Sequence, residues 1–182
     1  MGLLPIPLNN TGKQQAEQLG QKLKDKSIEA IFSSDLIRAK ETTEIINKFL
    51  DVPISYHEGL REHSLGKFDG MSVEKFLNNM DTMQKFDDLM REVGSETTME
   101  FVDRVWECFK KIVQDNKEKE NILILSHGGC NRSVVCKILE ASALVFDNLR
   151  QDNCCINRII YTNNDGEEQF SIKTVNEMCH IT

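Results

Sequence analysis

The stretch ILILSHGGCNRSVV, residues 122–135, joins a short apolar run to a group of polar residues. Its first four residues have the length and composition of a buried strand, and a helical pattern then continues to Leu139. Ser126, His127 and a Gly-Gly pair lie at the junction. In open α/β sheets this is where ligands bind, because strand ends and helix N-termini supply polar groups there. The stretch therefore predicts an α/β fold with a histidine placed at a strand end.

The rest of the chain alternates between helical and strand patterns in the same way. The expected helices cover about 11–26, 35–50, 72–91, 97–116 and 129–139, and the expected strands cover 28–32, 53–56, 121–125, 154–161 and 170–175. Asn10 or Thr11 is the expected N-cap of the first helix, and residues 59–70 are expected to form a long loop. This alternation predicts a three-layer α/β sandwich, with a mostly parallel central sheet flanked by helices.

Composition limits the classes of function. The chain has 182 residues with 40% hydrophobic residues, which favours one domain spanning residues 1–182. A net charge of -7 argues against nucleic acid as a partner, because phosphate-backbone binding depends on clustered Lys and Arg. No run of apolar residues is long enough to span a membrane, and no signal peptide is evident. We therefore expect a cytoplasmic protein without a membrane partner.

The six cysteines show no CxxC spacing. This pattern favours neither a zinc site nor a disulfide framework, so we expect reduced and mostly buried thiols. Cys130 directly follows the His-Gly-Gly sequence and could be considered as a nucleophile. Because no neighbouring residue plainly activates it, a small buried thiol is the favoured interpretation.

Polar residues that suit a phosphate ester follow several of the expected strands. Arg38 lies in the first turn of the helix after the strand 28–32, and Arg61 and Glu62 follow the strand 53–56. Guanidinium groups bind phosphoryl oxygens in bidentate fashion, and the helix N-terminus at Gly128 adds a favourable dipole. Glu62 could then protonate a leaving alcohol while His127 stabilises the transferred phosphoryl group. This interpretation requires neither a metal nor a cofactor.

Each of these residues also has a purely structural interpretation. Arg38 could form a salt bridge with Asp35 or Glu41 on its own helix. A packed or solvated side chain is the favoured interpretation for His57 and His180, and His63 could reach the rim of the site but is a poor candidate because it has no evident partner. The combination of candidates at several strand ends favours a functional site over these alternatives.

The motifs together resemble the histidine phosphatase superfamily, in its phosphoglycerate mutase-like branch 1. The resemblance is carried by GLLPIPLNNTGKQQAEQLGQKL (2–23), IFSSDLIRAKETTEII (31–46), LREHSLGKFDG (60–70), GSETTMEFVDRV (94–105) and ILILSHGGCNRSVV (122–135). It implies Arg38 as a phosphate ligand, Glu62 as the proton donor and His127 as the second histidine of the pocket. It also implies that Arg61 and Glu96 lie near the substrate.

The family's nucleophile lies in an R-H-G-x-T motif at the end of its first, central strand. No R-H-G occurs in these 182 residues, which begin just after the position of that motif in the family pattern. Because VNEMCHIT, residues 175–182, resembles the family's usual ending, a circular permutation is excluded. We therefore expect a chain that is truncated relative to the family and impaired or inactive as given, with a gap or an unusual filling in the middle of its sheet. A swapped or strand-exchanged dimer would be one such filling.

Three functions remain open from the sequence. The favoured one is a hydrolase of small phosphate monoesters acting through a phosphohistidine intermediate, with a small phosphorylated substrate as its partner. A pseudophosphatase that binds phosphate or a protein is the alternative from another class. Phosphoglycerate mutase chemistry is a third, less favoured because the chain lacks the insertion that the true mutases have after the position of Gly70. Specificity is expected to depend on the variable segment 71–96.

Overall fold

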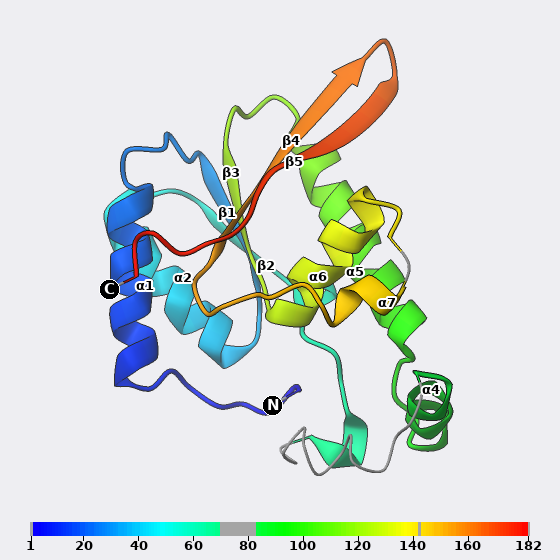
Figure 1. Ribbon diagram of the computed structural model, residues 1–182. Coiled ribbons are helices and arrows are strands. Elements are labelled where there is room, and N and C mark those ends of the chain that lie inside the picture. The colour runs from blue at the N-terminus through cyan, green and yellow to red at the C-terminus, as the bar shows by residue number, and fades with distance from the viewer. Residues whose placement is uncertain (1, 70–82, 142, 182) are drawn as a thin grey trace.

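A computed structural model describes residues 2–69, 83–141 and 143–181 of the chain (Figure 1). The elements follow the predicted alternation of helices and strands. In chain order they are α1 (Asn10–Leu23), β1 (Ala30–Ser34), α2 (Ile37–Leu50), β2 (Ile54–His57), the 3-10 turns η1 (Glu58–Leu60) and η2 (Gly66–Phe68), α4 (Met83–Glu92), α5 (Thr98–Asp115), β3 (Ile122–Leu125), α6 (Gly128–Ile138), α7 (Ala143–Phe146), β4 (Ile156–Asn164) and β5 (Glu167–Glu177).

Several boundaries differ from the expectation. The N-cap of α1 is Asn9, whose side chain accepts a 2.8 Å hydrogen bond from the amide of Gly12, so the prediction of Asn10 or Thr11 was wrong. Strand β1 begins two residues later than expected, and α7 was not predicted. The expected helix 72–91 is seen from Met83 onward, and its first part, including Phe76 and Met80, lies outside the described residues.

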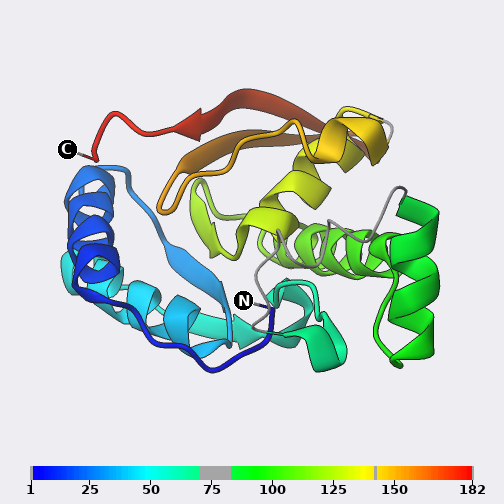
Figure 2. The same ribbon diagram turned by 60° about the horizontal axis from the view of Figure 1, so that its bottom comes forward.

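Three parallel strands form the main sheet in the order β2-β1-β3. Helices cover both of its faces (Figures 1 and 2). On one face Leu123 and Leu125 of β3 pack against Leu19 and Leu23 of α1. On the other face the cluster comprises Ala30, Phe32, Leu60 and Ile112, with Ile122 and Ile124 packed against it. The three-layer α/β arrangement predicted from the sequence is therefore confirmed.

The last two strands form a separate antiparallel hairpin, β4-β5, that is not hydrogen-bonded to the main sheet. Its turn consists of Asp165 and Gly166, both with positive φ (53° and 92°), as a tight hairpin requires. Phe170 of β5 packs its ring against Trp106 and Phe109 of α5, at centroid distances of 5.3 and 5.6 Å. The interrupted sheet predicted from the sequence is confirmed, because β3 and β4 belong to different sheets.

All six cysteines are free thiols, but only Cys130 and Cys136 are buried. The expectation that most of them would be buried was wrong, since three are half-buried and Cys179 is exposed. Among the described helices, none combines the length and the apolar composition that a membrane-spanning segment requires.

Candidate active site

His127 lies at the carboxyl end of β3, where it is the N-cap residue of α6. Its Nε2 atom is 2.8 Å from the hydroxyl oxygen of Ser34, which ends the adjacent strand β1. Burial, together with the nearby positive charges of Arg38 and Arg104, lowers the pKa of His127 to about 3. The imidazole is therefore neutral at pH 7 in the protein as it stands.

The strand end that meets His127 is held by a chain of buried hydroxyl groups. Thr43 of α2 donates a 2.8 Å hydrogen bond to the hydroxyl of Ser33, which in turn donates to the carbonyl of Ser34. All three side chains are fully buried. Because each hydroxyl in this chain has a partner, the position of Ser34 beside His127 is fixed from the sheet and from α2.

Glu62 reaches the same edge of the sheet from the loop after η1. Its two carboxylate oxygens accept hydrogen bonds from the amide of Gly129, at 3.1 Å, and from that of His63, at 2.9 Å. A Cβ atom at position 129 would lie 2.3 Å from one carboxylate oxygen of Glu62, whereas one at Gly128 would meet only Gln151, at 3.9 Å. Glycine at position 129 therefore allows the carboxylate to approach the first turn of α6.

Arg38 in the first turn of α2 points toward the N-terminal segment. Its Nη2 and Nη1 atoms donate to the carbonyls of Gly2, at 2.9 Å, and Leu4, at 3.3 Å. Burial lowers the pKa of the guanidinium, and the negative charge of Glu62 offsets part of this effect. In the described part of the chain Arg38 forms no ion pair with Asp35 or Glu41. The salt bridge considered as an alternative role for Arg38 is therefore not found.

The N-terminal segment that covers Arg38 is anchored at two further points. The amide of Leu8 donates a 2.6 Å hydrogen bond to Glu41 of α2, and the amide of Leu3 donates one of 3.1 Å to Asp69. In this structure the hydrogen bonds of the Arg38 guanidinium are therefore made to backbone carbonyls of the N-terminal segment. An anion that replaced these carbonyls would form stronger, charge-assisted hydrogen bonds.

Arg61 lies beside the site, but its guanidinium group is paired with the carboxylate of Asp35. Its Nε and Nη2 atoms donate to the two carboxylate oxygens of Asp35, at 2.7 and 2.5 Å. This pairing lowers the pKa of Asp35 and raises that of Arg61. It ties the Glu62 loop to the end of β1, so Arg61 acts as a support in this structure. A direct contact of Arg61 with substrate stays a prediction.

Glu96 is likewise engaged, by a residue that sequence reasoning missed. Arg104 of α5 donates from Nε and Nη2 to the two carboxylate oxygens of Glu96, at 2.8 and 2.6 Å. Its Nη1 atom donates to the carbonyls of Gly59 and Arg61, which precede Glu62 in the chain. Arg104 therefore holds two loops together beneath the site. Because Glu96 precedes the α5 helix, no helical spacing could have indicated this pair.

The other candidates from the sequence lie away from the pocket chemistry. His63, for which the sequence showed no evident partner, has its Nε2 atom 2.9 Å from the carbonyl of Glu96 and packs its ring on Phe101. His180 contacts the carbonyl of Cys154, and His57 packs on Phe32. Cys130 is buried, and burial raises the pKa of its thiol well above the usual value. The thiol is therefore protonated and inert.

The candidate site as a whole is a cluster of residues of mixed charge at the carboxyl edge of the sheet. Arg38 acts on His127 electrostatically and Glu62 acts on Arg38, so the three predicted residues lie within one electrostatic environment. The N-terminus of α6, at Gly128, adds backbone amides and the positive end of a helix dipole. Such a set can bind an anion and exchange a proton with it. No cluster of metal-ligating side chains is found among the described residues.

The chain is similar to known phosphatases and phosphoglycerate mutases. The chain is 32% identical over 187 residues to the uncharacterized phosphatase PhoE of Bacillus subtilis (strain 168), covering 100% of this chain and 87% of that protein. It is 29% identical to the probable phosphoglycerate mutase GpmB of Salmonella choleraesuis (strain SC-B67), covering 96% and 83% of the two chains.

Solved structures with the same fold include Bacillus stearothermophilus YhfR, with a TM-score of 0.80 and 24% identity over 97% of this chain and 87% of that chain. At this identity the likeness shows the fold alone. The model of the histidine phosphatase superfamily (branch 1) matches residues 1–177. With this match over nearly its whole length, the chain belongs to the histidine phosphatase superfamily, branch 1.

Proposed function

We propose that the protein is a phosphatase of small phosphate monoesters that acts through a phosphohistidine intermediate. The observation that carries this proposal is the convergence of Arg38, Glu62 and His127 on one edge of the sheet, beside the N-terminus of α6. A cation, a proton-transfer group and backbone amides are the parts that phosphoryl transfer requires. Hydrolysis is favoured over mutase chemistry by the absence of the insertion that true mutases carry after the position of Gly70.

Each residue takes a role in the proposed reaction that fits its position. Arg38 and the amides at Gly128 hold the phosphoryl oxygens. The nucleophilic histidine forms a P–N bond as the ester P–O bond breaks, and Glu62 donates a proton to the leaving alcohol. In the second step water attacks phosphorus, Glu62 takes the proton of that water, and the P–N bond to the nucleophilic histidine breaks. His127, which is neutral before substrate binds, is available to form a hydrogen bond to a phosphoryl oxygen.

The nucleophilic histidine in this proposal does not belong to the 182 residues. Three of the four histidines have other partners or positions: His57 lies on β2, His63 faces the carbonyl of Glu96 and His180 faces that of Cys154. His127 lies beside Ser34 and within the electrostatic influence of Arg38. This placement also supports the second candidate function for the chain by itself, a phosphate-binding module without turnover.

The remaining features of the proposal follow from the same family assignment. We take residues 1–182 as one α/β domain, of which the family match covers residues 1–177. The partner we propose is a small phosphorylated substrate, without nucleic acid or membrane, and the six free thiols suit the reducing cytoplasm. The open sheet edges make a strand-exchanged dimer the oligomer to test for.

Hydrolysis of p-nitrophenyl phosphate tests the proposal with three proteins. These are the 182-residue chain, a version extended at its N-terminus by an apolar strand that ends in Arg-His-Gly, and the extended version with His127→Ala. We expect turnover from the extended protein only, reduced by at least 100-fold in His127→Ala. The exposed substitution Arg150→Gln, in the extended protein, is the matched control and should leave turnover unchanged.

Two outcomes would contradict the proposal. If the 182-residue chain turned over and lost activity in His127→Ala, then His127 itself would be the nucleophile. If the extended protein bound phosphate but did not hydrolyse the ester, the binding-module function would replace the phosphatase.

A further inference from the structure

The contact between His127 and Ser34 can be made in two ways. The Nε2 atom of His127 lies 2.8 Å from the hydroxyl oxygen of Ser34, so one of these two groups donates a hydrogen bond to the other. A neutral imidazole carries its proton on one ring nitrogen and accepts at the other, whereas a hydroxyl can both donate and accept. Either Ser34 donates to Nε2 and the ring proton is on Nδ1, or Nε2 carries the proton and donates to Ser34.

A second hydrogen bond of the Ser34 hydroxyl limits this choice. The amide of Leu36 lies 3.4 Å from the hydroxyl oxygen, and an amide can only donate to it. Among the described residues, the hydroxyl of Ser34 has no hydrogen-bond partner besides this amide and the ring of His127. If Nε2 also donated to the oxygen, the proton of the Ser34 hydroxyl would find no acceptor in the described part of the chain.

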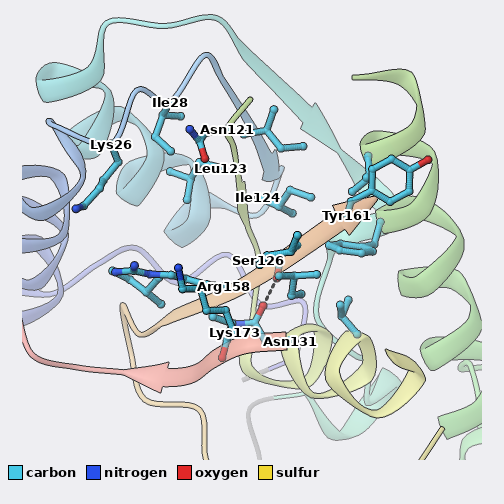
Figure 3. Close-up of a pocket in the computed structure, with 18 of the residues that line it drawn as sticks. Lys26, Ile28, Asn121, Leu123, Ile124, Ser126, Asn131, Arg158, Tyr161 and Lys173 are labelled. Carbon is cyan, nitrogen blue, oxygen red and sulfur yellow. Dashed lines mark hydrogen bonds between the residues drawn. The ribbon is translucent and has the colours of Figure 1, made fainter. Parts of the chain in front are cut away.

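Solvent does not supply the missing acceptor, because Ser34 is fully buried. A cavity of about 560 Å³ does lie nearby, between strands β3 and β4 (Figure 3). Its lining includes Ser126 and Asn131 but neither Ser34 nor His127, so water in this cavity does not contact the Ser34 hydroxyl. A buried donor without an acceptor is costly, and the arrangement in which Ser34 donates to Nε2 is therefore the favoured one.

The hydroxyl group that adjoins His127 in the chain does not compete for the ring. Ser126 donates a 2.9 Å hydrogen bond to the side-chain oxygen of Asn131, in the first turn of α6 (Figure 3). Ser34 is thus the side chain, among the described residues, that forms a hydrogen bond with the imidazole of His127.

The other ring nitrogen of His127 is left for the substrate. Nδ1 has no hydrogen-bond partner among the described residues, and it is not one of the buried polar atoms that lack a partner, so it is accessible. His127 directly precedes the N-terminal amides of α6 at Gly128, and the charge of Arg38 acts on its ring. A proton on Nδ1 can be donated to an anion that these groups hold, whereas a bare Nδ1 would turn its lone pair toward that anion.

We propose that Ser34 is a positioning residue, whose hydroxyl donates to Nε2 of His127 and thereby keeps the proton of the neutral ring on Nδ1, ready for donation to a phosphoryl oxygen. This role rests on the proposed phosphatase function, in which His127 binds the transferred phosphoryl group. Ser34 acts only through His127 and does not touch the substrate. The low pKa of His127 supports the arrangement, because a doubly protonated ring has no nitrogen that accepts from Ser34.

NMR of the imidazole nitrogens in the 182-residue chain tests the proposal directly. In protein labelled with ¹⁵N at its histidines, protonated and unprotonated ring nitrogens differ widely in chemical shift, and long-range couplings to the ring protons distinguish Nδ1 from Nε2. The variant His127→Gln identifies the signals of His127 by their loss. At pH 7 we expect a protonated Nδ1 and an unprotonated Nε2. A protonated Nε2, alone or together with Nδ1, would overturn the proposal, and this result requires no variant of Ser34.

The variant Ser34→Ala tests whether Ser34 is the cause. Without the hydroxyl, the proton of His127 should distribute over both ring nitrogens, and the Nε2 signal should move toward the protonated range. The matched control is Ser126→Ala, which removes the hydroxyl next to His127 in the chain and should leave both ring nitrogens unchanged. A proton that stays on Nδ1 in Ser34→Ala, or equal changes in the two variants, would show that Ser34 does not set the position of the proton.

A titration with inorganic phosphate links the position of this proton to binding. Phosphate should shift the Nδ1 signal of the parent protein while Nδ1 stays protonated. In Ser34→Ala the affinity should fall by about two- to fivefold, because only the fraction of molecules with the proton on Nδ1 can donate it. Ser126→Ala should bind phosphate as the parent does. Equal affinity in Ser34→Ala and the parent would overturn the contribution of Ser34 to the site.

Failure of this inference can be distinguished from failure of the proposed function. The nitrogen shifts are measured without turnover. If the extended protein did not hydrolyse p-nitrophenyl phosphate but the shifts were as expected, Ser34 would position His127 in a phosphate-binding module. Hydrolysis by the extended protein together with a protonated Nε2 would overturn the role of Ser34 and leave the phosphatase function in place.

Discussion

Strands β1 and β3 are neighbours in one parallel sheet. The more polar strand, β1, is the more deeply buried of the two, and the fully apolar strand, β3, is the more exposed. All five residues of β1 are buried, although the strand ends in two serines. None of the four residues of β3, all Ile or Leu, is buried. The difference lies in their neighbours: β1 has a strand on each side, whereas β3 has one strand and a cavity.

This comparison separates two contributions to the site. The pairing of β1 with β3 brings Ser34 and His127 to the same edge of the sheet, and this part is complete. The open side of β3 leaves the other flank of His127 without a neighbouring strand. Among the described residues, the candidate site is therefore flanked by a neighbouring strand on one side only.

The largest expected effect compares one core residue from each strand. Ile31 of β1 is fully buried, so Ile31→Ala should lower the free energy of unfolding by about 3 kcal/mol. Ile124 of β3 faces the cavity, and Ile124→Ala should cost only about 1 kcal/mol because the side chain already has fewer neighbours. Urea unfolding of the two variants measures both values, and equal losses would show that β3 is packed as tightly as β1.

The carboxyl end of β3, where His127 is largely buried, should be less accessible to water than the open edge of the strand. The pH dependence of the free energy of unfolding tests this difference. The pKa of His127 is about 3 in the folded protein and near 6.5 when unfolded, so only the unfolded chain gains this proton between these values. The stabilising contribution is complete above pH 6.5 and is lost progressively as the pH falls toward 3. From pH 7 to pH 5 the loss should be about 2 kcal/mol.

The variant His127→Gln removes this dependence and serves as the reference. The difference in unfolding free energy between the two proteins should change with pH, while contributions from the other histidines cancel. If the two stability curves ran parallel between pH 7 and pH 5, His127 would titrate normally and its end of β3 would be as open as the edge.

A smaller effect distinguishes the two glycines that follow His127. Gly129→Ala places a Cβ atom 2.3 Å from a carboxylate oxygen of Glu62, whereas Gly128→Ala meets no atom closer than 3.9 Å. We expect Gly129→Ala to cost about 1–2 kcal/mol by displacing Glu62, and Gly128→Ala to be neutral or slightly stabilising because alanine favours the helix. Thermal unfolding of both variants is the measurement. The opposite ranking would place Glu62 away from α6.

Much of the fold could be predicted because each local pattern agreed with the others. The runs that became β1, β2 and β3 were recognised, and so was the turn that joins β4 to β5. The burial of β3 could not be predicted from its composition, because it depends on which strand lies beside it. The N-cap of α1 was misplaced by one residue, since Asn9, Asn10 and Thr11 are all good caps.

The positions of Arg38 and His127 were predictable because each lies at the start of a helix that follows a strand, and Glu62 lies in the loop that was expected after β2. The supporting contacts were not predictable, because they connect distant segments: Arg61 binds Asp35, and Arg104 binds Glu96. Ser34 offered a signal that was available in advance. It ends strand β1, His127 follows the end of β3 by two residues, and the register places the two strand ends side by side.

The most direct test of the account is a titration of the 182-residue chain with inorganic phosphate at pH 7, followed by NMR of the backbone amides. If the pocket is complete on the β1 side, the amide signals of Gly128 and Gly129 should shift and saturate. Arg38→Gln should weaken this binding at least 10-fold. Glu41→Gln loosens the same N-terminal segment without removing the guanidinium, and it should bind phosphate as the parent does. Unchanged binding in Arg38→Gln, or shifts confined to exposed lysines, would contradict the account.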